Sequence, residues 1–462
     1  MDVVIILLAL GLLILVAYRG FSVIIFAPMA AMLAVVLTFP AMVLPYFSGV
    51  FMERMVDFVK LYFPVFLLGA IFGKVVAMSG FAKAITSFTL KTLGPERAIF
   101  AIVLVCALLT YGGVSLFVVA FAVYPFGAVL FRDANIPKRL LPATIALGAF
   151  TFTMDAFPGS PQIQNIIPTT FFRTDTWAAP WLGFLGGMFV FGTGLLYLQW
   201  QKNRADKGGE GYGEAHINEP EESSVKHIIS PYLALLPLLV VALTNKLFTY
   251  AIPVYYGKTV ELIGFGLEDP VDVTRLSAIW AVILALILGI ATVMALAFKS
   301  VWRNFNAEMN TAVGGALVAT LNTASEYGFG AVIAALPGFQ SVKGYISNTF
   351  NDLLVNLAVT VNVLSAITGS ASGGMSIALA AMGDTYLQAA QSLEIPPEVL
   401  HRVASMASGG MDTLPHNGAI ITLLLVCGLT HKQSYLDIFA LTGVKTAGVF
   451  FIIALYYALG IV

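Results

Sequence analysis

Long apolar runs separated by short polar stretches dominate this chain of 462 residues. A helix needs about 20 apolar residues to cross the roughly 30 Å hydrocarbon core of a bilayer. The runs near this length predict transmembrane helices at Val3–Ala17, Phe21–Phe39, Leu61–Met78, Trp177–Leu198, Ile229–Phe248, Leu276–Phe298, Thr311–Leu336 and Leu436–Leu459. We therefore expect an all-α polytopic membrane protein.

Two other apolar segments are divided by glycine-rich tips. Over residues 97–131, a run too short to cross a bilayer ends at Gly112-Gly113, and a second run follows at once. The same shape recurs over residues 355–390, around a tip that ends at Gly373-Gly374. Both segments are typical of re-entrant hairpins, which are tolerated at membrane depth where they are buried in protein or line a cavity.

Each hairpin is followed by a helix that breaks near its middle. The first broken helix covers 136–171 and is interrupted at Met154–Pro161. The second covers 395–429 and is interrupted at Met411–Gly418. Both interruptions contain proline, which removes a backbone donor and disfavours helix in the residue before it, so the pattern predicts true breaks.

These landmarks recur in the same order at nearly constant offsets of 261, 259 and 257 residues. The matching pairs are Gly112-Gly113 with Gly373-Gly374, Ile136-Pro137 with Ile395-Pro396, and Met154-Asp155 with Met411-Asp412. Shared hydropathy alone would not reproduce the positions of Asp, Pro and Gly-Gly. The pattern predicts two repeats, residues 1–200 and 229–462, joined by a polar linker over 201–228.

The number of crossings predicts how the repeats are oriented. Each half contains four spans and one broken span, and an odd number of crossings inverts the second half relative to the first. With the linker in the cytoplasm, 15 Lys and Arg residues lie inside and 8 outside, which puts both termini outside by the positive-inside rule. This count places Lys445 on the inside, Arg402 on the outside and Lys74 within a span.

Composition excludes several classes of protein. The chain is 59% hydrophobic and only 11% charged, against about 25% charged residues in soluble domains. A net charge of -1 argues against a nucleic-acid partner. Cys106 and Cys427 lie in apolar runs and the five histidines are scattered, so we expect neither a metal site nor another cofactor.

Inverted repeats with broken helices are typical of secondary transporters, whose sites lie where helices unwind. The positive amino-terminal ends of short helices can bind an anion there. We expect the two tips and the two breaks to meet at such a site. The candidate residues in the tips are Thr110, Tyr111, Gly112, Gly113, Ser115, Thr368, Gly369, Ser370, Ser372, Gly373 and Gly374, and those in the breaks are Asp155, Ser160, Gln162, Gln164, Asn165, Asp412, Thr413, His416 and Asn417.

Ionisable residues inside membrane helices mark ion or proton pathways. Asp412, with His416 nearby, and Glu326, within a predicted span, are therefore candidate proton carriers. The alternatives are structural. The aspartates can cap the half-helices that follow them, Glu326 can pair with Lys74, and the small tip residues can serve close helix packing.

The run Thr110-Tyr111-Gly112-Gly113-Val114-Ser115-Leu116-Phe117, then Ile136-Pro137-Lys138-Arg139 and then 149–164, resembles the gluconate permease (GntP) family of proton symporters within the ion transporter superfamily. The resemblance covers nearly the whole chain. At the first break, Met154–Pro161 replaces the His- and Pro-rich motif of the sugar-acid members and is more similar to β-hydroxybutyrate permeases. The resemblance implies a dimeric importer of the bacterial inner membrane that works as an elevator, with hairpins and broken helices moving against the other spans.

We therefore expect a proton symporter that imports a small organic-acid anion, such as 3-hydroxybutyrate or a gluconate-like acid. Sodium coupling is the alternative, because hydroxyls and free carbonyls at hairpin tips also bind Na⁺. A membrane-embedded hydrolase that uses Asp155 and Asp412 as an acid pair is a more distant alternative. Since no motif supplies a nucleophile or a metal, we do not expect an enzyme.

Overall fold

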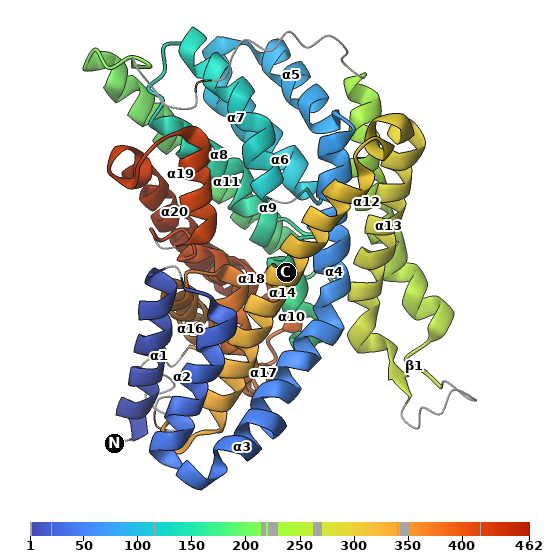
Figure 1. Cartoon of the computed structure of the whole chain (residues 1–462), viewed down its shortest axis with the longest axis vertical. Helices are drawn as coiled ribbons and strands as arrows, with labels where there is room; N and C mark the ends of the chain where they lie inside the picture. Colours follow the sequence, from blue (N-terminus) through green and yellow to red (C-terminus); the bar gives the residue numbers. More distant parts are fainter. Residues whose placement is uncertain are drawn as a thin grey trace.

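The computed structural model describes residues 2–19, 21–114, 116–213, 219, 230–261, 270–339, 341, 352–415 and 417–462. These residues form an all-α membrane protein, so the fold class expected from the sequence is confirmed (Figure 1). The strands in the described part are β1 (Thr259–Val260) and β2 (Val271–Asp272), which form a short antiparallel ribbon.

Five helical stretches in the described residues are long and apolar enough to cross a membrane. They are Pro40–Met78, α11 (Pro180–Lys207), α12 (Pro231–Tyr256), α13 (Val273–Trp302) and α20 (His431–Leu459). A bent pair, α5 (Phe81–Leu93) with Pro95–Tyr111, would make six if it counts as one span. The total of ten crossings stays a prediction.

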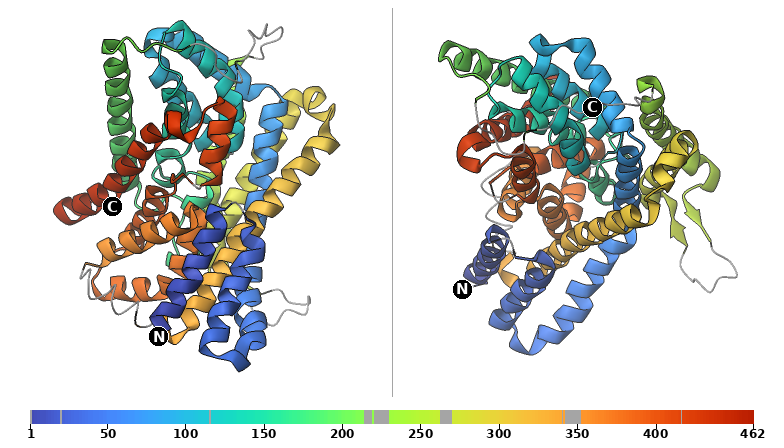
Figure 2. Two further views of the ribbon diagram at one scale, coloured as in Figure 1. Left: turned by 60° about the vertical axis from the view of Figure 1, so that its left-hand side comes forward. Right: turned by 45° about the horizontal axis from the view of Figure 1, so that its top comes forward.

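One group of helices, which we call the frame, packs along one side of the molecule (Figure 2). Within the frame α14 packs against α2 and α4, and α4 packs against α13. The frame consists of α1 (Asp2–Tyr18), α2 (Val23–Thr38), η1 (Pro40–Met42), α3 (Val43–Tyr46), the π-helix η2 (Phe47–Met52), α4 (Glu53–Met78), α12, α13 and α14 (Phe305–Ala335).

The remaining helices form a second group, the central bundle, which α5 and η3 (Pro95–Arg97) connect to the frame. It contains both expected hairpins as pairs of packed helices and both expected broken helices. The hairpins are α6 (Ala98–Tyr111) with α7 (Leu116–Asp133), and α16 (Leu353–Thr368) with α17 (Ala371–Ser392). The broken helices are α8 (Leu140–Ala149) with α9 (Phe152–Asp155) and α10 (Ile163–Phe172), and α18 (Pro397–Gly410) with α19 (Gly418–Cys427); α11 and α20 complete the bundle.

Each broken helix of the central bundle packs against both hairpins. The first half of each broken helix packs against the hairpin that precedes it in the chain, α8 on α6 and α18 on α16. The second half packs against the other hairpin, α10 on α17 and α19 on α7. This reciprocal arrangement brings both breaks to the middle of the bundle, which positions the candidate site.

The second hairpin tip is shorter than the sequence suggested. Helix α17 begins at Ala371, so Ser372, Gly373 and Gly374 lie in its first turn rather than in the tip. The reason is local, because the Ser370 hydroxyl accepts a 3.0 Å hydrogen bond from the Gly373 amide and caps the helix. Glycines at the start of a helix are tolerated when a cap satisfies the free amides.

The described part of the predicted linker is attached to the bundle. Glu219 accepts a 2.7 Å hydrogen bond from Lys138, and Glu210 accepts one of 2.7 Å from Arg139, at the start of α8. These ion pairs hold the described part of the linker at the start of the first broken helix.

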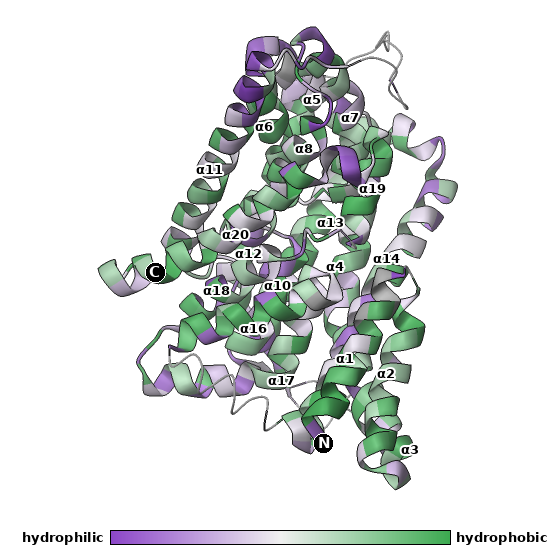
Figure 3. Cartoon of the chain, turned by 90° about the vertical axis from the view of Figure 1, so that its left-hand side faces the viewer, coloured by the Kyte–Doolittle hydropathy of each residue, from purple (hydrophilic) through white to green (hydrophobic). Residues whose placement is uncertain are grey.

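The outer surface carries the apolar side chains that a bilayer requires. Leu243 and Leu436 are 69% and 77% exposed, and long helices are mostly hydrophobic along their length, with hydrophilic residues gathered at ends such as that of α11 (Figure 3). In contrast, the buried face of α2 consists mainly of alanine. Small residues between helices are typical of packing in membranes, where close approach replaces the hydrophobic effect.

Candidate functional site

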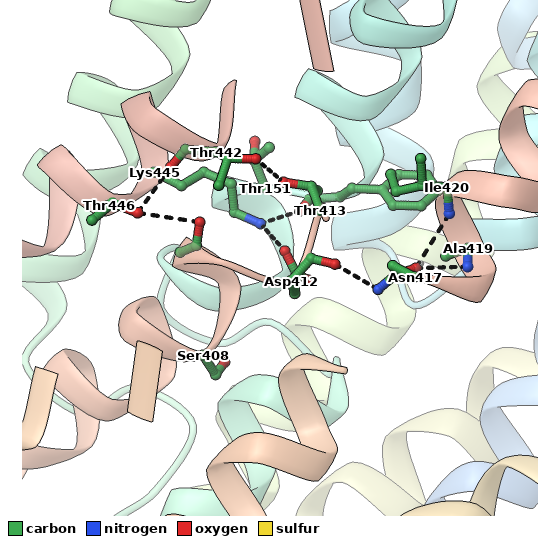
Figure 4. Close-up of polar contacts among 12 residues, drawn as sticks. Thr151, Ser408, Asp412, Thr413, Asn417, Ala419, Ile420, Thr442, Lys445 and Thr446 are labelled. Atoms are coloured by element: carbon green, nitrogen blue, oxygen red, sulfur yellow. Dashed lines mark hydrogen bonds and ion pairs between the residues drawn. The ribbon is translucent and has the colours of Figure 1, made fainter. Parts of the chain in front are cut away.

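The two breaks meet at the side chain of Lys445, from the middle of α20 (Figure 4). Its ammonium donates a 2.7 Å hydrogen bond to the carboxylate of Asp412 and a 2.9 Å hydrogen bond to the carbonyl of Phe150, where α8 ends. The Lys445 side chain is only 3% exposed. Because carbonyls at the carboxyl end of a helix carry partial negative charge, one ammonium neutralises both acceptors.

Asp155 reaches the same place from the first break. It is the last residue of α9 and is buried. A Cβ atom on Gly409, in the last turn of α18, would overlap the Asp155 carboxylate and would lie 3.1 Å from Cε of Lys445. Gly409 therefore leaves room for both side chains, and Asp155 and Asp412 share one buried cluster with Lys445.

Arg402, on α18, holds the backbone of the first break. The buried guanidinium donates hydrogen bonds to the Asp155 carbonyl at 3.2 Å, to the Ala178 carbonyl at 2.7 Å and to the Asn165 side-chain oxygen at 3.0 Å. Its Nε has no hydrogen-bond partner in the described part of the chain. Together with Lys445, Arg402 gives the cluster two cations for its two carboxylates, which lowers the cost of burying each charge.

Two side-chain amides connect each break to the hairpin tip that precedes it in the chain. Gln162 donates a 2.8 Å hydrogen bond to the Thr110 carbonyl, and Asn417 donates a 2.7 Å hydrogen bond to the Gly369 carbonyl. These residues are the N-cap residues of α10 and α19. The Tyr111 hydroxyl adds a 2.7 Å hydrogen bond to the Pro158 carbonyl. Each tip is therefore connected by hydrogen bonds to one break.

The first tip and break leave several polar groups open. The Thr110 hydroxyl and the side-chain oxygen of Gln164 are buried without hydrogen-bond partners among the described residues. Gln162 provides no side-chain cap for α10, whereas Asn417 caps α19 through the amides of Ala419 and Ile420. An uncapped helix start beside a free hydroxyl and a free amide is suited to an anion that also carries hydroxyl groups.

Other candidates in the breaks stabilise the loops. Ser160 donates a 2.6 Å hydrogen bond to the Thr153 carbonyl, and Asn165 donates hydrogen bonds to the Ser160 and Thr176 carbonyls. The hydroxyl of Thr413 contacts that of Thr442 on α20. These contacts fix the shape of the site and leave little capacity for a ligand.

Glu326 lies against the second hairpin and is not paired with Lys74. A Cβ atom on Gly373 would overlap the Glu326 carboxylate. Lys74 instead contacts Glu308 at 2.5 Å, so the predicted Glu326–Lys74 pair is wrong. The physical reason is helix register, because Glu308 lies 18 residues, about five turns, before Glu326 on α14.

The sequence missed the two buried cations. Lys445 and Arg402 counted as an inside and an outside charge in the topology expected from the sequence, whereas both are buried in helices of the central bundle. Their positions within predicted helical segments were the signal, since a cation there must find a buried partner. Two predicted site residues, Ser115 and His416, lie outside the described residues.

A comparison with known proteins places the chain among transporters. It is 56% identical to YxjC of Bacillus subtilis strain 168, an uncharacterized transporter, over 476 aligned positions that cover 100% of both chains. No protein-family model matches the sequence. Membership of the gluconate permease family stays a prediction.

Two solved structures share the fold at low sequence identity. The YdaH transporter of Alcanivorax borkumensis matches with a TM-score of 0.53 and 15% identity, over 91% of this chain and 90% of that one. MtrF of Neisseria gonorrhoeae, from a class of antimetabolite efflux pumps, matches with a TM-score of 0.55 and 13% identity, over 90% and 85%. At such identities the likeness concerns the fold alone.

Proposed function

The chain belongs to the family of the Bacillus subtilis transporter YxjC, and we propose that it is a proton symporter that imports a small organic-acid anion. The observation that carries this proposal is the buried cluster of Lys445, Asp412, Asp155 and Arg402 where the two broken helices meet. Charged groups in the middle of a membrane protein are costly and mark the path of a charged substrate.

The substrate class follows from the open groups beside this cluster. A carboxylate at the uncapped start of α10 would accept hydrogen bonds from the free backbone amides and would be stabilised by the positive end of the helix dipole. The Thr110 hydroxyl and the side-chain oxygen of Gln164 would form hydrogen bonds with the hydroxyl group of the same molecule. A short hydroxy acid such as 3-hydroxybutyrate fits this chemistry, and a gluconate-like acid is the larger candidate.

The proposed mechanism moves the central bundle against the frame. The site residues come from the central bundle, whereas the frame helices α12, α13 and α4 cover the first tip through Leu238, Leu286 and Phe72. The apolar cover favours an elevator-type motion, and this motion must also break the hydrogen bonds that Asn245 and Tyr62 of the frame donate to the Gly159 carbonyl and to Thr170. We propose that the linker faces the cytoplasm of a bacterial cell and that both termini face outside.

The test is transport by the purified protein in liposomes. We expect exchange of radiolabelled 3-hydroxybutyrate against a panel of unlabelled short hydroxy acids and sugar acids, with the best competitor identifying the substrate. An inward proton gradient should drive net uptake in sodium-free buffer, and a protonophore should abolish it.

Two outcomes would contradict the proposal. Absence of exchange with every monocarboxylate in the panel would reject the substrate class. A strict requirement for sodium would reject proton coupling and favour the alternative in which hydroxyls at the hairpin tips bind Na⁺.

A further inference from the structure

We propose that Glu326 is the proton-binding group that locks the second hairpin onto the frame and releases it when the proton leaves. This inference rests on the proposed proton symport and assigns the coupling proton to a residue outside the cluster around Lys445. It concerns the contact between α14 of the frame and α17 of the central bundle.

The geometry at this contact is unusual for a carboxylate. Glu326 is 4% exposed, and its Oε2 has no hydrogen-bond partner among the described residues. The same oxygen lies directly against Gly373, in the first turn of α17, where a Cβ atom would overlap it. The start of α17 is therefore built to accept this side chain, and any residue larger than glycine would displace it.

Further polar groups nearby also lack partners. Ser325 on α14, Ser365 on α16 and Ser376 on α17 are buried and have hydroxyls without hydrogen bonds in the described part of the chain. At the edge of the contact, Thr323 and Ser372 approach each other at 3.5 Å between their hydroxyls. The contact between hairpin and frame is thus polar and incompletely satisfied, unlike the apolar cover of the first tip.

A proton suits this position better than a metal ion. The carboxylate oxygen touches the α17 backbone, so an ion of ordinary size has no space between them. A proton bound to the carboxylate needs almost no additional space and neutralises the charge of Glu326. Because burying a carboxylate without a compensating charge is strongly unfavourable, the packed contact favours the neutral acid.

The charged groups around α14 do not compensate Glu326. Neither α2, η2 nor α16 carries a charged residue. The other titratable groups on α4, α14 and α17 have different partners or locations. Lys74 pairs with Glu308, Tyr62 is hydrogen-bonded to Thr170, and Tyr386 is hydrogen-bonded to Asn356. Glu53, Arg54, Tyr327 and Asp384 line a cavity of about 660 Å³, and Lys60 and Asp57, which pairs with Arg54, lie on the same part of α4. Asp412 already has an ammonium at 2.7 Å, whereas Glu326 has no such partner among the described residues.

The consequence is a coupling between charge and motion. With its proton bound, Glu326 remains between α14 and α17 and the hairpin stays seated. When the proton leaves, the carboxylate requires water, and separation of α17 from α14 becomes favourable. Proton release on one side of the membrane would therefore free the central bundle to move.

The decisive variant is Glu326→Gln, which keeps the shape of the neutral acid but cannot lose a proton. In liposomes we expect it to lose both substrate exchange and accumulation driven by a proton gradient, because its hairpin stays seated on the frame. A gradient of one pH unit supports about tenfold accumulation when one proton accompanies one anion, and the variant should fall to a ratio of about one. Glu326→Asp should restore part of the accumulation, and Glu308→Gln, on the same helix, should behave like the wild type.

A second measurement follows the hairpin directly. Ser372→Cys places a thiol at the edge of the contact, and its labelling by N-ethylmaleimide should accelerate with rising pH more than that of a free thiol. The additional Glu326→Gln substitution should remove this excess.

The outcomes separate this inference from the proposed function. Failure of the wild type to accumulate substrate under a proton gradient would reject proton symport itself. If the wild type accumulates substrate and Glu326→Gln does so equally, with unchanged labelling, only the role of Glu326 is rejected. Sodium-dependent protection of the thiol that requires Glu326 would also overturn the assignment and make the site a cation site.

Discussion

At the scale of single residues, Lys445 shows why buried charges in this protein come in sets. Its ammonium is removed from water and is stabilised by the Asp412 carboxylate and by the carbonyl at the end of α8. Removing one member of such a pair leaves the other charged and buried, which costs more than the pair contributes.

We predict that Lys445→Met destabilises the protein by about 3 to 5 kcal/mol and abolishes transport, because Asp412 loses its partner. The double variant Lys445→Met/Asp412→Asn should recover part of this stability, since neither charge is then buried alone. Chemical denaturation in detergent measures both effects. Lys432→Met, at an exposed position on the same helix, is the control and should change stability by less than about 0.5 kcal/mol. A Lys445→Met variant as stable as this control would contradict the ion pair.

At the scale of helices, the side-chain amides of Gln162 and Asn417 both precede a helix but make different contacts. Asn417 both caps α19 and contacts the second tip, whereas Gln162 contacts the first tip without capping α10. The second break is therefore closed by its own side chains, and the first leaves its helix start open for a ligand.

This difference predicts unequal effects of two matched variants. Asn417→Ala should lower stability by about 1 kcal/mol through loss of the cap, and Gln162→Ala by less. Both variants should accelerate hydrogen exchange at their own tip, near Gly369 and near Gly112 respectively, as measured by mass spectrometry. Unchanged exchange at both tips would show that the amides do not hold them.

At the scale of the whole molecule, two groups of helices meet along interfaces of different character. The first hairpin lies against apolar side chains of the frame, and the second lies against Glu326 and hydroxyls of α14. A rigid-body motion between the groups must break the second contact, which makes this contact the place to test the motion.

We predict that a disulfide between Thr323→Cys and Ser372→Cys stops transport, because it joins α14 to α17. Oxidation of the double variant should abolish exchange, and a reductant should restore it. Each single variant should be insensitive to the oxidant. Continued exchange by the cross-linked protein would rule out movement of the second hairpin against the frame.

The sequence by itself predicted the all-α membrane fold, the two helix pairs and the positions of both breaks, whereas its candidate site residues stay a prediction. Apolar run length, Gly-Gly and Asp-Pro patterns act through local backbone physics, so they can be identified without a structure. The short tip at Ser370 was less predictable, since a single capping hydroxyl decides where α17 begins.

Only the tertiary structure decided which charges meet. Lys445 lies 33 residues after Asp412, and Arg402 lies 247 residues after Asp155. No local pattern encodes such pairings, because they depend on how α18 and α20 pack around both breaks. The separation of Glu326 from Lys74 and its contact with Gly373 are likewise set by helix register in three dimensions, where burial makes each unpaired charge expensive.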